Sequence, residues 1–105
     1  MIEKRKDGWR AEDQFPFDGP RRLAVKTYKI NGYLVTHAAV NSYYPGGYEH
    51  AYGLGAGGDF GKYVFRIPGG RATEKTVAAQ HAQALAMVPQ LIEEARAHYA
   101  QTIAA

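Results

Sequence analysis

The four histidines are the side chains of this chain best suited to proton transfer or metal binding. They are His37, His50, His81 and His98. None lies four residues from another histidine, and the chain contains no cysteine, so the usual spacing of a metal site is missing. His81 falls in an apolar helix stripe, which is typical of a core histidine. We therefore predict no metal ion and no cofactor, and we expect His37 and His50, which lie among tyrosines, to contact a partner.

Groups for covalent or acid–base catalysis are also scarce. Ser42 is the only serine, and it lacks the sequence context of a nucleophile elbow. Glu93 and Glu94 are consecutive, so on a helix their carboxylates point in different directions. The sequence therefore predicts a protein without enzymatic activity.

Residues 53–58 contain the letters of a dinucleotide-binding glycine loop. In that fold the glycines follow a strand and open a helix, whereas here another strand is predicted to follow them. We interpret the match as accidental and expect a hairpin loop. Its exposed amides at Gly55, Gly57 and Gly58 remain an alternative site for an anion.

An Asn31-Gly32 pair organises the most regular part of the sequence. Residues 23–30 and 33–40 are rich in strand formers, and Asn-Gly between two such runs is a strong hairpin signal, because both loop residues take positive φ. A two-residue loop pairs Ile30 with Tyr33, Tyr28 with Val35 and Lys26 with His37.

This register divides the side chains between two faces. The smaller, more aliphatic face suits packing against a helix and consists of Leu23, Val25, Thr27, Leu34, Thr36, Ala38 and Val40. The opposite face is too apolar for a surface that meets only water and consists of Ala24, Lys26, Tyr28, Ile30, Tyr33, Val35, His37 and Ala39.

The rest of the chain completes an α+β fold. We predict a third strand at 48–54 and a fourth at 62–67, with Tyr63, Phe65 and Ile67 on one side. A helix should begin after an N-cap at Thr73, with a single apolar stripe that runs to residue 99. Because Pro89 lies inside this stripe, the helix should kink there. The predicted architecture is an antiparallel four-stranded sheet packed on one C-terminal helix kinked near Pro89.

Residues 1–20 show no period, and we predict an extended or partly disordered arm that is basic and aromatic, followed by a single α+β domain at 21–105. Residues 1–30 carry eight Lys/Arg against five Asp/Glu, whereas the remainder is neutral. The sequence contains neither a secretory signal nor an apolar run long enough for a membrane helix, so we expect a soluble, cytoplasmic protein that does not bind membranes.

Tyrosine suggests the function. Seven of the eight tyrosines fall in the sheet region, and tyrosine is enriched at interaction surfaces. The first hypothesis is a small non-enzymatic interaction module, such as an inhibitor or accessory factor. It would bind a protein partner or a second copy of itself, as a homo-oligomer, through a tyrosine-rich sheet face or edge. The predicted contact residues are Lys26, Tyr28, Tyr33, Val35, His37, Tyr48, His50 and Tyr52.

Two alternatives remain open. The first is a nucleic-acid-binding protein that combines exposed tyrosines with a basic N-terminal arm. Its predicted phosphate contacts are Lys4, Arg5, Lys6, Arg10, Arg21 and Arg22. The second is a small-ligand or anion binder at the Gly53–Gly61 loop.

Overall fold

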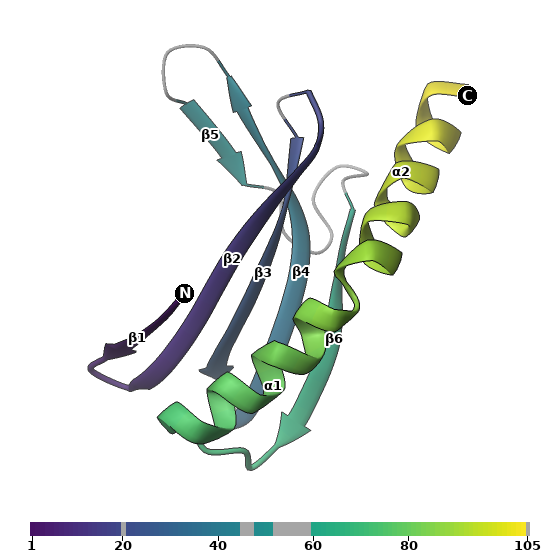
Figure 1. Cartoon of the computed structure of the whole chain (residues 1–105). Coiled ribbons are helices and arrows are strands. Elements are labelled where there is room, and N and C mark those ends of the chain that lie inside the picture. Colours follow the sequence, from purple (N-terminus) through teal and green to yellow (C-terminus); the bar gives the residue numbers. More distant parts are fainter. Residues whose placement is uncertain (20, 45–47, 52–59, 105) are drawn as a thin grey trace.

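The computed structural model of the chain describes residues 1–19, 21–44, 48–51 and 60–104 (Figure 1). Within these ranges it has six strands followed by two helices. The elements are β1 (Ile2–Arg5), β2 (Gly8–Asp18), β3 (Arg21–Ile30), β4 (Tyr33–Tyr44), β5 (Tyr48–Ala51), β6 (Gly61–Pro68), α1 (Glu74–Ala86) and α2 (Val88–Ala104). None of the helices in these ranges has the length and apolar character needed to cross a membrane.

The central hairpin of β3 and β4 has the register predicted from its turn. Ile30 pairs with Tyr33 and Lys26 with His37, and both turn residues have positive φ, 51° at Asn31 and 81° at Gly32. The turn chemistry therefore sets which side chains share a face, as expected for a two-residue hairpin loop.

The sheet is antiparallel throughout and follows the order β1-β2-β3-β4. The far edge of β4 is shared, because β6 pairs with residues 33–39 and β5 with residues 41–44. The sheet is therefore five strands wide. The α+β class and the antiparallel sheet are confirmed, but the predicted number of four strands is wrong.

The additional strands come from the N-terminus. Residues 2–18, for which the sequence suggested an extended or partly disordered arm, form β1 and β2 instead. β2 covers the edge of β3 from Ala11 to Asp18, and the Trp9 amide donates a hydrogen bond to the Ala72 carbonyl at 2.8 Å. Ala11 is buried, and Phe15 and Phe17 pack against the core. The aromatic residues of this segment therefore dock on the protein itself.

The face assigned to the core is the one that the helices cover. Leu23, Val25, Ala38 and Val40 are buried in one cluster with residues of both helices, and Leu34 packs in a second cluster with Val77 and Ala11. The helix residues in the first cluster are Ala84, Val88, Leu91, Ala95 and Tyr99. The apolar stripe predicted from the sequence therefore faces the sheet.

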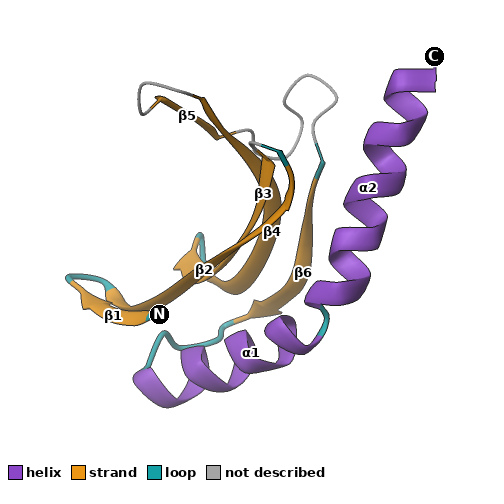
Figure 2. Cartoon of the chain, turned by 45° about the horizontal axis from the view of Figure 1, so that its top comes forward, coloured by secondary structure: helices purple, strands orange, loops and turns teal. Residues whose placement is uncertain are grey.

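The helical region is divided in two, which corrects the expectation of one kinked helix. α1 ends at Ala86, Met87 is its C-cap, and Pro89 is the second residue of α2. In the first turn of a helix the missing N–H of proline leaves no hydrogen bond unmade, so the chain restarts the helix there instead of bending through it. Figure 2 shows the result, with both helices on the outer side of the bent sheet.

A bulge corrects the predicted faces of β6. The pairing with β4 shifts between Thr36 and His37, so Phe65 lies opposite Thr36 while Tyr63 lies opposite His37. Because of this extra residue, Phe65 packs toward the helices and Tyr63 takes the opposite face. The three alternating residues of β6 therefore do not share one side.

Candidate functional site

The face of the sheet away from the helices is not covered by any described element, and it lies on the inner side of the bend (Figure 2). Cross-strand partners share a face, so the pairing defines its members. We call this surface the open face. Its described charged, polar and aromatic side chains are Glu3, Arg5, Arg10, Glu12, Gln14, Arg22, Lys26, Tyr28, Tyr33, His37, Asn41, Tyr63 and Arg66.

The small apolar residues at the centre of the open face are buried and cannot contact a partner. Ala24, Val35 and Ala39 are 2%, 1% and 6% exposed, although they belong to neither core cluster. Val35 lies between Tyr28 and Arg66 in the sheet, and long side chains converge on the inner side of a bend. Val35, predicted as a partner contact, is therefore buried beneath the larger residues of its own face.

Arginine and tyrosine side chains form the outer layer of the open face. The Arg66 guanidinium lies 4.2 Å from the ring centre of Tyr33 and 5.9 Å from that of Tyr63, and Arg10 lies 5.9 Å from the ring of Tyr28. These are cation–π distances, which orient both the charges and the rings. Burial, and then the neighbouring Tyr63, raise the pKa of Tyr28, while Arg10 opposes the increase.

His37 lies at the centre of the open face. It pairs with Lys26 and with Tyr63, whose ring centre is 5.5 Å from its own. Burial, followed by the charge of Lys26, lowers the pKa of His37 below its ordinary value of 6.5, so the ring is neutral near pH 7. Its buried Nε2 atom has no hydrogen-bond partner within the described part of the chain.

The charge of the protein is concentrated on this face. Its described side chains include five cations and two carboxylates, which gives +3, the same as the formal net charge of the whole chain. Arg5 pairs with Glu3 at 2.8 Å, and Arg10 lies 4.0 Å from Glu12. Lys26 and Arg66 have no carboxylate partner among the described side chains.

The predicted phosphate contacts are divided between the two sides of the sheet. Arg5, Arg10 and Arg22 lie on the open face. Lys4 pairs with Trp9 on the other face, Lys6 lies in the turn after β1, and Arg21 stacks on Tyr99 of α2 at 4.0 Å. A basic arm therefore does not exist as one unit. Sequence reasoning missed Arg66 and grouped Tyr63 with Phe65 and Ile67 on one side, because the β6 bulge left no signal in the residue pattern.

Several predicted residues cannot be placed in the site. Tyr48 and His50 lie in β5, but their side chains are outside the described part of the structure, and Tyr52 is outside it altogether. Gly55, Gly57 and Gly58 also fall outside the described residues, so the predicted anion loop stays a prediction. The described residues contain no group of His, Cys, Asp and Glu side chains that could hold a metal ion.

A second polar group lies under α1, on the helix side of the sheet. His81 Nε2 is 2.9 Å from Asp13 Oδ2, and its Nδ1 is 2.8 Å from the Thr27 hydroxyl. Burial would raise the pKa of Asp13, but hydrogen bonds from the Met1 ammonium group and His81 lower it below its ordinary value. The acid–histidine–hydroxyl order resembles that of a hydrolase, yet Thr27 is fully buried, so no substrate reaches it.

Comparisons with known proteins do not identify a relative. No protein family, no curated protein and no solved structure matches this chain.

Proposed function

We propose that this protein is a non-enzymatic binding module whose open face binds single-stranded nucleic acid. The observation that supports the proposal is the layer of five cations, two carboxylates and three tyrosine rings among the described side chains of a face that no described helix covers. A positively charged surface attracts the phosphate backbone, and aromatic rings stack on unpaired bases.

The residues divide between these two tasks. Lys26 and Arg66, which lack a carboxylate partner among the described side chains, contact phosphates directly. The ring of Tyr63, 43% exposed, offers the most accessible stacking surface. The Arg66 guanidinium, held over Tyr33 at 4.2 Å, keeps its hydrogen-bonding edge available for a phosphate.

A single strand fits this surface better than a duplex, because the bases of a duplex are stacked on each other and cannot stack on tyrosine. It also fits better than a partner bound by hydrophobic contact. That hypothesis depended on the apolar residues of the face, and although Ile30 is 42% exposed, Ala24, Val35 and Ala39 are buried.

Fluorescence anisotropy with a labelled oligonucleotide of about fifteen nucleotides tests the proposal. We expect the single strand to bind at least about tenfold more tightly than the duplex of the same sequence. The variant Tyr63→Ser should weaken single-strand binding about fivefold or more, since one stacked base contributes roughly 1–3 kcal/mol.

Ile67→Ser is the matched control. Ile67 belongs to the same strand and is 46% exposed, but it pairs with Leu34 and faces the helix side. The substitution should leave the affinity for single-stranded nucleic acid within about twofold of that of the unmodified protein. Equal affinity for single strand and duplex, or no binding at low salt, would contradict the proposed function.

The edge of β6 favours a second candidate function, binding of a protein partner or of a second copy of this chain. β6 pairs with β4 along one edge, and no strand among the described residues pairs with the other. Tyr63 and Ile67 expose apolar surface beside that edge, and an open edge can add a strand from another chain.

Light scattering over a range of protein concentrations tests this candidate. Association through β6 predicts a mass that doubles with concentration and returns to that of the monomer in Ile67→Lys. A constant monomer mass would exclude self-association and leave a different protein as the partner for this edge.

A further inference from the structure

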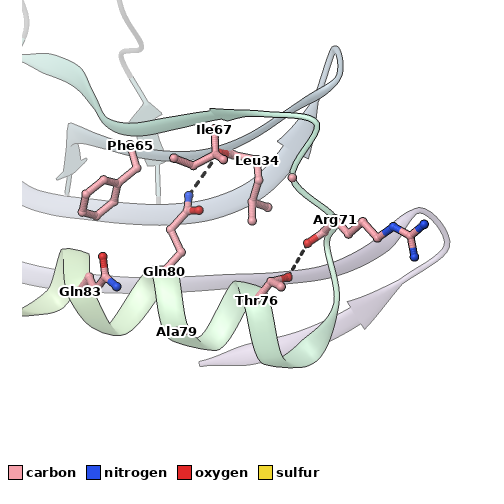
Figure 3. A pocket seen from close by; sticks show the side chains of 9 residues that line it. Leu34, Phe65, Ile67, Arg71, Thr76, Ala79, Gln80 and Gln83 are labelled. Atoms are coloured by element: carbon pink, nitrogen blue, oxygen red, sulfur yellow. Dashed lines mark hydrogen bonds between the residues drawn. The ribbon is translucent and has the colours of Figure 1, made fainter.

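The groove between α1 and β6 forms a pocket of about 380 Å³ on the helix side of the sheet (Figure 3). Leu34, Phe65, Ile67 and Ala79 supply its apolar surface. Gly70, Arg71, Thr76, Gln80 and Gln83 supply the rest. The volume lies in the range of small-molecule sites, and the pocket is on the opposite side of the sheet from the open face.

The pocket exists because of the sequence of α1. Thr76, Ala79, Gln80 and Gln83 recur at the three- and four-residue spacing of one helix face. This face borders β6, where Phe65 and Ile67 point toward the helix. No large apolar side chain of α1 fills the space opposite them, and Ile67 remains 46% exposed.

Gln80 is the fixed polar group in this pocket. Its Nε2 donates to the Leu34 carbonyl at 3.2 Å and to the Thr36 hydroxyl at 3.0 Å, which uses both of its amide hydrogens. Figure 3 shows the side chain rising from α1 between Phe65 and Leu34. The Oε1 atom accepts no hydrogen bond from the described residues, so it is a preorganised acceptor.

Two other polar side chains at the edge of the pocket, Thr76 and Arg71, do not offer a fixed group to a ligand. The Thr76 hydroxyl donates to the Arg71 carbonyl as part of the helix cap, so it is not available as a donor to a ligand. The Arg71 side chain points away from the pocket in Figure 3. Gln83 also lines the pocket, but it is exposed, whereas two hydrogen bonds hold Gln80 in place. The acceptor with a fixed position is therefore Gln80 Oε1, which calls for one hydrogen-bond donor on a ligand.

We propose that this pocket binds a small, flat, largely apolar molecule that carries one hydroxyl or N–H donor. The apolar body packs against Phe65, Ile67 and Ala79, and the donor reaches Gln80 Oε1. The site is separate from the open face, so this proposal does not depend on the nucleic-acid-binding function.

A pair of probes isolates the hydrogen bond. The full chain, labelled with ¹⁵N, is titrated with 2-naphthol and with 2-methoxynaphthalene, which have the same aromatic body but differ in the donor. We expect 2-naphthol to shift the amide signals of Thr76, Ala79 and Gln83 and to bind about tenfold more tightly, the effect of one hydrogen bond.

Two alanine variants locate the binding. Ala79→Leu fills the pocket from an exposed helix position and should abolish binding of both probes. Ala86→Leu makes the same change at an exposed position of α1 outside the pocket, and binding should remain within about twofold. Unchanged binding in Ala79→Leu, equal affinity for the two probes, or no shift of these amides by 2-naphthol would each overturn the proposal.

Discussion

The side chains of Gln80, Thr36, Thr27, His81 and Asp13 form a continuous hydrogen-bond chain whose direction can be deduced. A carbonyl oxygen only accepts hydrogen bonds, so the Gln80 amide nitrogen must donate to the Leu34 carbonyl. The same nitrogen donates its second hydrogen to the Thr36 hydroxyl. At the other end the Asp13 carboxylate only accepts, so His81 Nε2 donates to it. In the neutral imidazole Nδ1 then accepts from the Thr27 hydroxyl, which in turn accepts from Thr36. A polar residue in an apolar helix stripe is accommodated because each of its nitrogens has a partner.

Thr27→Val tests this chain. Valine has nearly the same shape as threonine, but it leaves His81 Nδ1 and the Thr36 hydroxyl with an unmade hydrogen bond under α1. We expect the free energy of unfolding to fall by about 1–3 kcal/mol. Urea denaturation measures the change, and an unaltered midpoint would show that the hydroxyl does not bond to the histidine.

His37 predicts a pH dependence of stability. Burial and the Lys26 charge lower its pKa in the folded protein, so the unfolded chain binds the proton more readily. The stability from the neutral ring is fully present above the ordinary value of 6.5 and is lost as the pH falls through the lower folded pKa. His37→Gln should therefore flatten the urea midpoint as a function of pH below 6.5. Parallel profiles for the two proteins would contradict the assignment.

At the level of elements, the two helices are matched to the bend of the sheet. The buried positions stay in phase from Val77 through Ala84 and Leu91 to Tyr99, although the chain leaves the helix at Met87. This break lets α1 and α2 follow the outer side of the bend separately (Figure 2).

Pro89→Ala shows whether proline is the cause of the break or is simply tolerated there. In the first turn of α2 the proline makes no steric demand on a preceding helical turn, so the free energy of unfolding should change by less than about 1 kcal/mol. A continuous helix strained by proline would instead gain roughly 3 kcal/mol from the substitution. Urea denaturation distinguishes these outcomes.

For the whole molecule, the location of the charge matters more than its sum. The described side chains of the open face sum to +3, whereas Arg71 and Lys75 are exposed cations at the start of the helical region. Two double variants with identical net charge therefore separate the two surfaces. They are Lys26→Gln with Arg66→Gln, and Arg71→Gln with Lys75→Gln.

We expect the open-face variant to bind single-stranded DNA about tenfold more weakly and to lower the magnitude of the log–log salt slope by roughly 1.4, at about 0.7 per phosphate contact. The variant Arg71→Gln with Lys75→Gln should keep both the affinity for single-stranded DNA and the salt slope of the unmodified protein. A salt series followed by anisotropy provides the measurement. Equal losses in both variants would mean that attraction depends on net charge and not on this face.

Local chemistry in the sequence was sufficient for the central hairpin and for the helix stripe. Asn31 and Gly32 set the register of β3 and β4 within a few residues of chain, and the spacing of Val77, Ala84 and Ala95 marked the buried helix face. Both signals depend on interactions between residues that are close in the sequence, so they can be recognised from the sequence alone.

The tertiary structure decided the rest. β2 carries a partial local signal, because Trp9, Ala11, Phe15 and Phe17 recur at the two-residue spacing of a strand, but Asp13 interrupts this alternation. Its pairing partner β3 supplies the hydrogen bonds, and the core supplies the contacts for Phe15. The β6 bulge and the bend of the sheet bring Tyr63 and Arg66 onto the open face and bury Val35 beneath its neighbours. Sequence patterns assign a residue to a face, whereas its exposure depends on the curvature and on long-range pairing, which form only when the whole sheet is assembled.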